Sequence, residues 1–107
     1  MSKDFYTSAS IDASGTWLQG KMNATKEAIE AVFGRQTHSF DSFEKVTTEW
    51  VIAFDDGLIA TIYDWKRYEQ GAPRLNERYM WHIGGASDDV VARVTGAMRA
   101  NLAVSAS

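Results

Sequence analysis

The chain has 107 residues, of which 45% are hydrophobic and 23% charged, and its formal net charge is −3. This is the composition of an ordinary globular protein, and the length suits one domain, which we expect to occupy residues 1–107 with an ordered core at about 4–103. The absence of cysteine excludes disulfides, thiolate metal sites and cysteine nucleophiles. The mild, interspersed charge argues against nucleic acid as a partner, because a dedicated nucleic-acid binder usually carries a basic stripe.

The N-terminal residues 1–6 lack the apolar core of a signal peptide. No run of the sequence approaches the roughly 18 to 20 apolar residues that a membrane span requires. We therefore expect a cytoplasmic protein that makes no contact with a membrane.

The beginning of the chain carries two strand-like stretches, residues 5–11 and 16–22. The Ala-Ser-Gly sequence at 13–15 separates them and is typical of a turn. The two stretches are therefore predicted to pair with each other as a β-hairpin.

A short helix is predicted next, from residue 24 or 25 to Phe33. Either Asn23 or Thr25 is its N-cap, and Gly34 stands at its C-terminal cap position. Its apolar stripe, at helical spacing, consists of Ala28, Ile29, Val32 and Phe33.

The clearest signal is a second hairpin, in which residues 45–54 and 58–65 are rich in β-branched and aromatic residues. Asp56-Gly57 between them favours a two-residue turn of type I′, in which both residues take positive φ. That turn sets the register of the whole hairpin. The register pairs Ala53 with Ala60, Trp50 with Tyr63 and Glu49 with Asp64, and it places Trp50, Tyr63 and Trp65 on one face.

Residues 66–78 contain the only proline and many charges, and they are predicted to form an exposed loop. A third strand is predicted at 79–83, ended by Gly84-Gly85. A second helix begins after Ser87 as N-cap, with acidic residues 88–89 in its first turn, where the helix dipole favours them. The apolar face of this helix consists of Val90, Val91, Val94, Ala97, Met98 and Leu102.

These elements give the order β-β-α-β-β-β-α. We expect an α+β fold, an antiparallel sheet of three to five strands with two helices packed on one face. Both faces of the central hairpin are apolar near its turn, so the face away from the helices needs a second cover, for which a partner is one possibility.

Glu49, Asp64 and Lys66 meet at the open end of the predicted hairpin, with His82 on the neighbouring strand. Two facing carboxylates raise each other's pKa, so the pair is a candidate for general acid–base chemistry or for half of a metal site. The alternative is that a lysine or arginine neutralises the pair on a solvated end of the sheet, and we adopt it. We therefore expect no catalytic residue, no metal and no cofactor. His38, the only other histidine, falls in a predicted loop.

Residues 84–87, Gly-Gly-Ala-Ser, lead into the second helix, where free backbone N–H groups can hold a phosphate. Asp88 and Asp89 would repel an anion at that position. The sequence matches neither a P-loop nor a dinucleotide fingerprint. We interpret it as the end of a strand followed by an N-cap.

The chain contains four tryptophans and four tyrosines. Those of the hairpin, with Trp81 beside them, are either a core under the helices or the anchors of a protein interface. Arginines and a tyrosine of loop 66–78 would form the rim of such an interface and can clasp a carboxylate or a phosphate. The candidate binding residues are Trp50, Tyr63, Trp65, Arg67, Tyr68, Arg74, Arg78, Trp81 and His82.

Three stretches of the sequence occur together. Residues 18–34 run from Leu-Gln-Gly through Ala-Thr into a helix closed by Phe-Gly, and residues 49–66 run from Glu-Trp-Val-Ile through Asp-Gly to Ala-Thr-Ile-Tyr-Asp-Trp-Lys. The third stretch, residues 81–85, is Trp-His-Ile-Gly-Gly. This combination resembles a group of small α+β accessory proteins encoded in tailed-bacteriophage genomes, over about residues 15–95. The resemblance implies a phage protein in a bacterial host cytoplasm, where many such proteins bind a host factor. It carries over no catalytic residue.

Three hypotheses follow. The first is a non-enzymatic binding protein that engages a host protein, or a second copy of itself as a homodimer, through an aromatic sheet face. The second is a binder of a small anionic or nucleotide-like ligand, which needs a pocket on which arginines converge. The third is a small hydrolase based on Glu49, Asp64 and His82, which needs these three residues together in a cleft.

Overall fold

The structure is a computed structural model that describes residues 5–41 and 43–106, without the side chains of Glu69 and of residues 102–106. The expected start of the core at residue 4 and the side chain of Leu102 lie outside the described residues. In chain order the elements are β1 (Phe5–Thr7), β2 (Trp17–Thr25), α1 (Lys26–Phe33), β3 (His38–Ser39), β4 (Thr48–Phe54), β5 (Ile59–Tyr63), a 3₁₀ helix (Tyr68–Gln70), β6 (Arg78–Gly85) and α2 (Asp89–Ala106).

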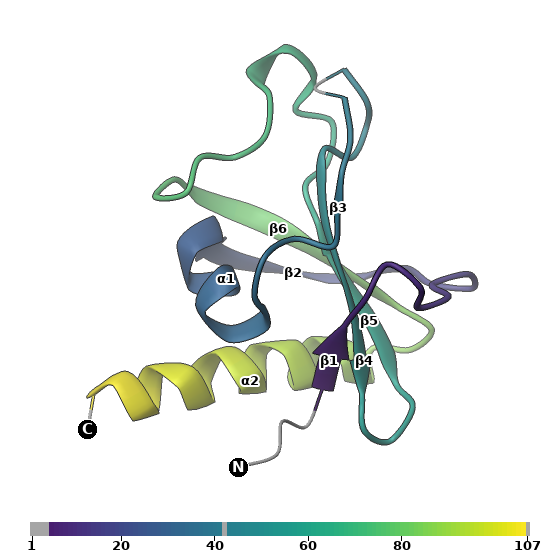
Figure 1. The fold of residues 1–107 in the computed structure, drawn as a ribbon, viewed down its shortest axis with the longest axis vertical. Helices are drawn as coiled ribbons and strands as arrows, with labels where there is room; N and C mark the ends of the chain where they lie inside the picture. Colours follow the sequence, from purple (N-terminus) through teal and green to yellow (C-terminus); the bar gives the residue numbers. More distant parts are fainter. Residues whose placement is uncertain (1–4, 42, 107) are drawn as a thin grey trace.

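Within the described residues, six antiparallel strands form one sheet in the order β1-β4-β5-β6-β2, and the short β3 also pairs with β4. Both α1 and α2 pack on the same face of this sheet (Figure 1). The α+β fold with helices on one face is therefore confirmed. The two-residue strand β3 was not predicted, because two residues carry no periodicity that a sequence pattern reveals.

The predicted N-terminal hairpin is wrong, because β1 and β2 lie at opposite edges of the sheet. The turn itself is present: the Thr16 amide donates to the Ala13 carbonyl at 3.3 Å, and Gly15 has a φ of +80°. However, β1 pairs with β4, and β2 pairs with β6 from Trp17 to Thr25, with a shift of register between Leu18 and Gly20. Two strand-like stretches beside a turn need not pair with each other when longer partners elsewhere bury more of their side chains.

The first helix begins and ends where its caps predict. The Thr25 hydroxyl accepts a hydrogen bond from the Ala28 amide at 3.1 Å, and the amide of Gly34 donates to Glu30 at the other end. Ile29 and Phe33 are buried against the sheet. Local capping chemistry thus suffices to define α1.

The second helix, α2, begins at Asp89, after the predicted N-cap Ser87. The amides of Val90 and Val91 donate to the carbonyls of Ser87 and Asp88 and so build its first turn. Val90 and Val94 are fully buried, which confirms the predicted apolar face at these positions.

The turn between β4 and β5 is one residue longer than predicted. Gly57 has a φ of +89°, whereas the φ of Asp56 is not positive. A type I′ turn needs a positive φ at both residues, so this turn is not type I′. The amide of Gly57 donates to the Phe54 carbonyl, and the amide of Phe54 donates to the Leu58 carbonyl across a three-residue loop. This is a type I turn followed by a glycine in the left-handed region, the common three-residue alternative.

The extra turn residue shifts the hairpin register by one. Trp50 stands opposite Ile62, and Glu49 stands opposite Tyr63. Because successive strand residues point to opposite faces, the shift moves Tyr63 to the face opposite that of Trp50. The predicted pairs Trp50–Tyr63 and Glu49–Asp64 are therefore wrong.

Strand β6 continues through Gly84 and Gly85, where the sequence predicted its end. A Cβ atom on Gly84 would lie 2.5 Å from Thr61 Oγ1, and one on Gly85 would lie 2.6 Å from a methyl group of Val90. The glycines thus belong to the sheet, and their missing side chains leave room for residues packed against them.

Alternate strand residues divide into two faces. The face toward α1 and α2, here called the helix face, carries the core. The opposite face is here called the second face, and the connection from β1 to β2 runs on that side (Figure 1). In the described part of the chain, neither helix is long and apolar enough to cross a membrane. The core side chains of the helix face are Met22, Ala24, Trp50, Ile52, Phe54, Ala60, Ile62, Trp81 and Ile83.

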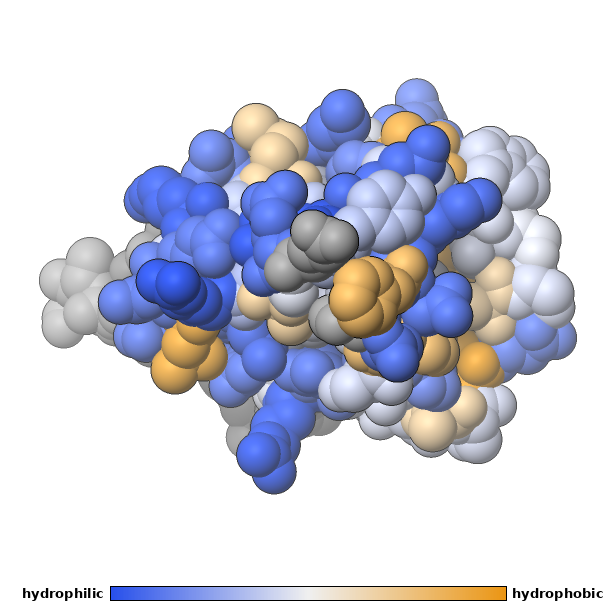
Figure 2. All heavy atoms as spheres, turned by 90° about the horizontal axis from the view of Figure 1, so that it is seen from above, coloured by the Kyte–Doolittle hydropathy of each residue, from blue (hydrophilic) through white to orange (hydrophobic). Residues whose placement is uncertain are grey.

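Loop 66–78 lies beyond the end of the sheet (Figure 1). Figure 2 shows the molecule from above, turned by 90° from Figure 1, and this surface is mainly hydrophilic with scattered hydrophobic residues. The loop is held by Arg67, which donates to the Gly71 carbonyl at 2.8 Å and forms an ion pair with Glu77 at 3.0 Å. Lys66 and Tyr68 on either side of it have positive φ, 53° and 47°. The loop is therefore an ordered structure built around one partly buried arginine.

Candidate functional site

The two tryptophans of the helix face are structural. Trp50 and Trp81 are fully buried, with their rings 5.3 Å apart in an edge-to-face contact. The indole N–H of Trp50 donates to the Gly34 carbonyl, and that of Trp81 donates to the Ala24 carbonyl. Both candidates therefore belong to the core and are unavailable to a ligand.

The second face presents a continuous row of five polar or titratable side chains, one from each of five adjacent strands. His38 in β3 stands opposite Glu49 in β4, and Glu49 stands opposite Tyr63 in β5. Tyr63 stands opposite His82 in β6, which stands opposite Lys21 in β2. Residues paired across antiparallel strands share a face, and their Cβ atoms lie about 5 Å apart, so the five side chains are neighbours on this face. This set is here called the transverse row.

Trp65 extends the row on the same face. Its ring stacks on His82 with centroids 5.9 Å apart, and it meets Tyr63 edge-on at 6.2 Å. Tyr63 and His82 are themselves 5.4 Å apart. Tyr63, Trp65 and His82, three of the predicted binding residues, are therefore brought together.

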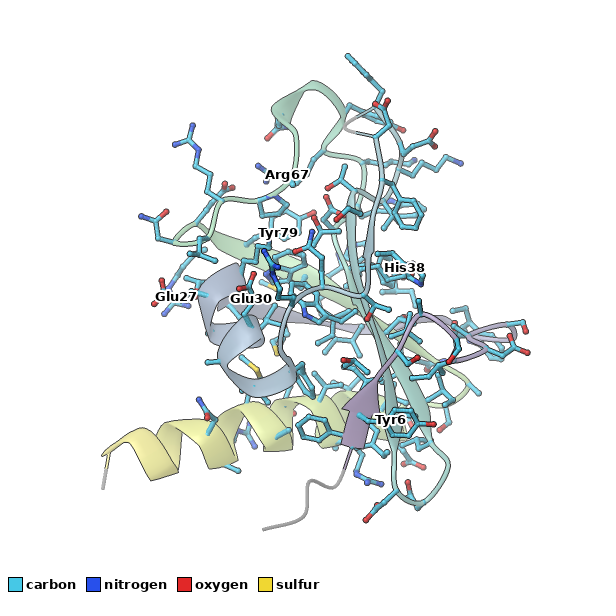
Figure 3. All side chains as sticks on the ribbon, viewed as in Figure 1. Tyr6, Glu27, Glu30, His38, Arg67 and Tyr79 are labelled. Atoms are coloured by element: carbon cyan, nitrogen blue, oxygen red, sulfur yellow. The ribbon has the colours of Figure 1, made fainter. Side chains whose placement is uncertain are left out.

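Other large apolar side chains of the second face are open to solvent. Tyr6 stands opposite Ala53, and Met80 lies two residues before His82 on β6. Their exposed fractions are 61% and 47%, and that of Trp65 is 39%. Figure 3 shows Tyr6 and His38 on the side of the sheet away from α1.

The surroundings of the row shift the pKa values of three of its members. Burial raises the pKa of the half-buried Glu49 carboxyl, while the neighbouring His38 acts in the opposite direction. Burial, followed by the charge on Glu49, raises the pKa of the Tyr63 hydroxyl. Burial and then Lys21 lower the pKa of His82, against a smaller effect of Asp64. The centre of the row thus favours neutral side chains.

Asp64, the second carboxylate of the candidate pair at the open end of the hairpin, is buried and already hydrogen-bonded. It accepts hydrogen bonds from the amides of Thr47 at 2.7 Å and Thr48 at 3.0 Å, and from the Thr47 hydroxyl. It anchors the chain where β4 begins. The carboxyl groups of Glu49 and Asp64 therefore do not form the facing pair that the sequence predicted.

A pocket of about 220 Å³ opens beside the row. Glu49, Tyr63 and Trp65 belong to its lining, and no described residue forms a hydrogen bond or ion pair with the Glu49 carboxylate. The other lining residues are Thr16, Trp17, Val46, Thr61 and Gly84.

The predicted arginine rim is divided between the two faces of the sheet. Arg67 packs over the ring of Tyr79 at 5.0 Å, and Tyr79 packs against the core on the helix face. Figure 3 shows Arg67 and Tyr79 on the side of the sheet that carries α1. Arg78 alternates along β6 with Met80 and His82 and so lies on the second face. It donates to Asn23 and lines a pocket together with residues of β2 and the helices.

Arg67 and Arg74 do line one pocket, at the loop, together with Glu77. The Glu77 carboxylate accepts from the Arg74 amide and pairs with Arg67, and these contacts hold the pKa of Glu77 below its ordinary value. The positive charge of Arg67 is thus already neutralised from within the loop. Tyr68, on the same loop, is 41% exposed.

The glycine pair at 84–85 lies within the ladders that β6 forms with β5 and β2. Residues 84–85 of the candidate anion site are therefore part of the sheet and not of a loop that leads into α2. Among the described residues, no three His, Asp or Glu side chains are grouped to hold a metal ion.

Sequence reasoning missed two members of the row, Lys21 and His38. Strand β2 was predicted, but its pairing with β6, which brings Lys21 to His82, was not. His38 falls in a strand too short to detect, and the correct hairpin register alone would have placed Tyr63 beside Glu49.

Comparisons of this chain with protein-family models, with curated proteins and with solved structures found no match.

Proposed function

We propose that this chain is a non-enzymatic binding protein that engages a protein partner through the second face of its sheet. The observation that carries the proposal is the contrast between the two faces. On the helix face the tryptophans are buried and their indole N–H groups are bonded within the chain. On the second face, Trp65 and Met80 are exposed beside a titratable row.

Aromatic side chains with one apolar and one polar end are favoured anchors of protein interfaces. Trp65 is held for such a role, because the Tyr79 hydroxyl accepts a hydrogen bond from its backbone amide at 3.0 Å. The neighbouring His82 and Tyr63 restrict its ring from two sides. A pre-positioned side chain loses less conformational entropy on binding.

The partner in this proposal is a bacterial host protein or a second copy of this chain. The sequence resemblance to phage accessory proteins favours the host protein. Edge strand β2 and the face itself leave room for self-association, so the oligomeric state has to be measured first.

The two alternatives receive less support from the geometry. Asp64 is engaged by Thr47 and Thr48, and Glu49 and His82 lie on either side of Tyr63, about 10 Å apart at two strand spacings. A hydrolase that uses the three together would need them within mutual reach. A binder of anions would need arginines whose charge is available to the ligand, whereas Arg67 already forms an ion pair with Glu77.

The test compares variants of the two surfaces. Light scattering during gel filtration measures self-association, and affinity capture from bacterial lysate followed by mass spectrometry detects a host partner. Trp65→Ala is expected to abolish the complex found with the wild-type chain. Leu75→Ala is the matched control, since Leu75 is a comparably exposed apolar side chain on the loop. A complex that survives both Trp65→Ala and Met80→Ala contradicts the proposal, as does a wild-type monomer that captures no protein.

A further inference from the structure

The pocket beside the transverse row has an unusual combination of walls. Glu49 is the one charged residue among the described residues that line it, and Tyr63 and Trp65 contribute aromatic rings. The planes of those two rings stand at 72° to each other, so they form two sides of a corner. Glu49 is half-buried next to them.

The size of the pocket limits what can enter it. Its volume of about 220 Å³ is below the roughly 300 Å³ at which ordinary small-molecule sites begin. It suits the end of one long side chain better than a cofactor or a nucleotide.

The chemistry of the walls favours a cation. Aromatic ring faces attract cations, and a carboxylate in a partly dry setting gains most from a positive partner that also donates hydrogen bonds. Trp65 already attracts one cation, since Lys66 Nζ lies 5.7 Å from its ring centroid. Lys66 does not line the pocket, and no residue that the structure describes forms an ion pair with the Glu49 carboxylate.

We propose that this pocket receives an arginine side chain of the protein partner, with the guanidinium stacked on an aromatic wall and hydrogen-bonded to Glu49. The inference rests on the proposed function and names the chemical group that the second face recognises. Arginine fits better than lysine because its guanidinium is planar, stacks on rings and is less strongly hydrated than an ammonium group.

The experiment follows the four indole N–H resonances in ¹H–¹⁵N NMR spectra during titration with N-acetyl-arginine amide. The resonance of Trp65 is expected to shift, whereas those of Trp50 and Trp81, buried and bonded inside the core, report that the fold is intact. N-acetyl-citrulline amide, similar in shape but uncharged, is expected to leave Trp65 unshifted.

Glu49→Gln is expected to weaken arginine binding about tenfold, the usual size of one charge-assisted hydrogen bond. Glu27→Gln, which neutralises an exposed glutamate on α1, is expected to leave the binding constant unchanged. The inference is overturned if citrulline shifts Trp65 equally, if lysine amide binds as tightly as arginine amide, if Glu49→Gln binds as well as the wild type, or if arginine causes no shift. If arginine fails while Trp65→Ala still abolishes the partner complex, the binding function stands and only the arginine assignment falls.

Discussion

Asp64 and Glu49 show how differently one sheet can treat two carboxylates. Asp64 is completely buried, but two backbone amides and a hydroxyl donate to it. Glu49 is half-buried on the second face, and no described group donates a hydrogen bond to its carboxylate. The first is therefore a structural anchor, and the second is available to a ligand.

Removing the Asp64 carboxylate should cost substantial stability. Asp64→Ala leaves the buried amides of Thr47 and Thr48 without a partner, and we expect the free energy of unfolding to fall by about 3 kcal/mol. Urea denaturation measures the change. Glu44→Ala, the loss of an exposed carboxylate, should change it by less than about 0.5 kcal/mol. Equal effects of the two substitutions would show that Asp64 does not anchor β4.

Glu49 should make stability depend on pH. Burial raises its pKa in the folded chain above the ordinary value of 4.5, so the folded state binds the proton more tightly than the unfolded state. Its contribution to stability is fully present below pH 4.5 and is lost as the pH rises through the raised folded pKa. The variant Glu49→Gln has no carboxyl group to titrate and cannot lose this contribution. The stability of the variant relative to the wild type should therefore increase between pH 4 and pH 7.

Denaturation of both proteins at these two pH values tests the expectation. Glu44→Gln, a charge-matched change at an exposed position, controls for general effects of net charge. The difference in unfolding free energy between the wild type and Glu49→Gln is the quantity to compare. If it stays constant with pH, or changes in the opposite direction, Glu49 does not have a raised pKa in the folded chain.

At the scale of elements, the pairing of β6 with its neighbours depends on glycines that a sequence pattern interprets as a strand end. Gly84 lies under Thr61 and Tyr63, and Gly85 lies under Val90 of α2. Side chains that occupy the place of a missing Cβ bring β5 and α2 close to β6. By contrast, a Cβ atom built on Gly96 in α2 would meet nothing within 4 Å.

This contrast predicts opposite effects of one substitution. Gly84→Ala places a Cβ 2.5 Å from Thr61 Oγ1 and 3.3 Å from the Trp17 carbonyl, so we expect a loss of about 1 to 3 kcal/mol in unfolding free energy. Gly96→Ala should gain about 0.5 to 1 kcal/mol, because alanine is the better helix former and nothing obstructs it. Thermal and urea unfolding compare them. If Gly84→Ala were as stable as Gly96→Ala, close packing at Gly84 would not explain its presence.

At the scale of the whole molecule, the sheet order places β5 in the middle and β1 and β2 at the edges. β5 pairs on both sides, with β4 and β6, and carries buried Ala60 and Ile62. The short β1 and β3 pair on one side only. Stability should therefore decrease from the centre of the sheet toward β1 and β3.

Hydrogen exchange measured by NMR checks this order. Amides of β5 and β6 that bond within the sheet should exchange slowest, at rates set by global unfolding, and those of β1 and β3 should exchange faster through local opening. Equally slow exchange in β1 and β5 would contradict the strand order. Addition of a partner that binds the second face should slow exchange at its edges without altering α1.

Much of the fold could be predicted, because helix caps, turn residues and apolar periodicity act over a few neighbouring residues. Thr25 and Gly34 bound α1, and the strands on either side of Asp56-Gly57 form a hairpin, as their local sequence indicates. The candidate site could be predicted only in part. Tyr63, Trp65 and His82 do lie together, but Trp50 and Trp81 belong to the core.

The sequence by itself thus determined the elements and the α+β class, while the tertiary structure decided which strands pair and which face each side chain joins. Asp-Gly is compatible with turns of two or three residues, and one residue of difference moves Tyr63 to the other side of the sheet. Likewise, only the total burial gained by the whole chain sends β1 and β2 to opposite edges. These choices depend on contacts between residues far apart in the sequence, and the transverse row exists because of them.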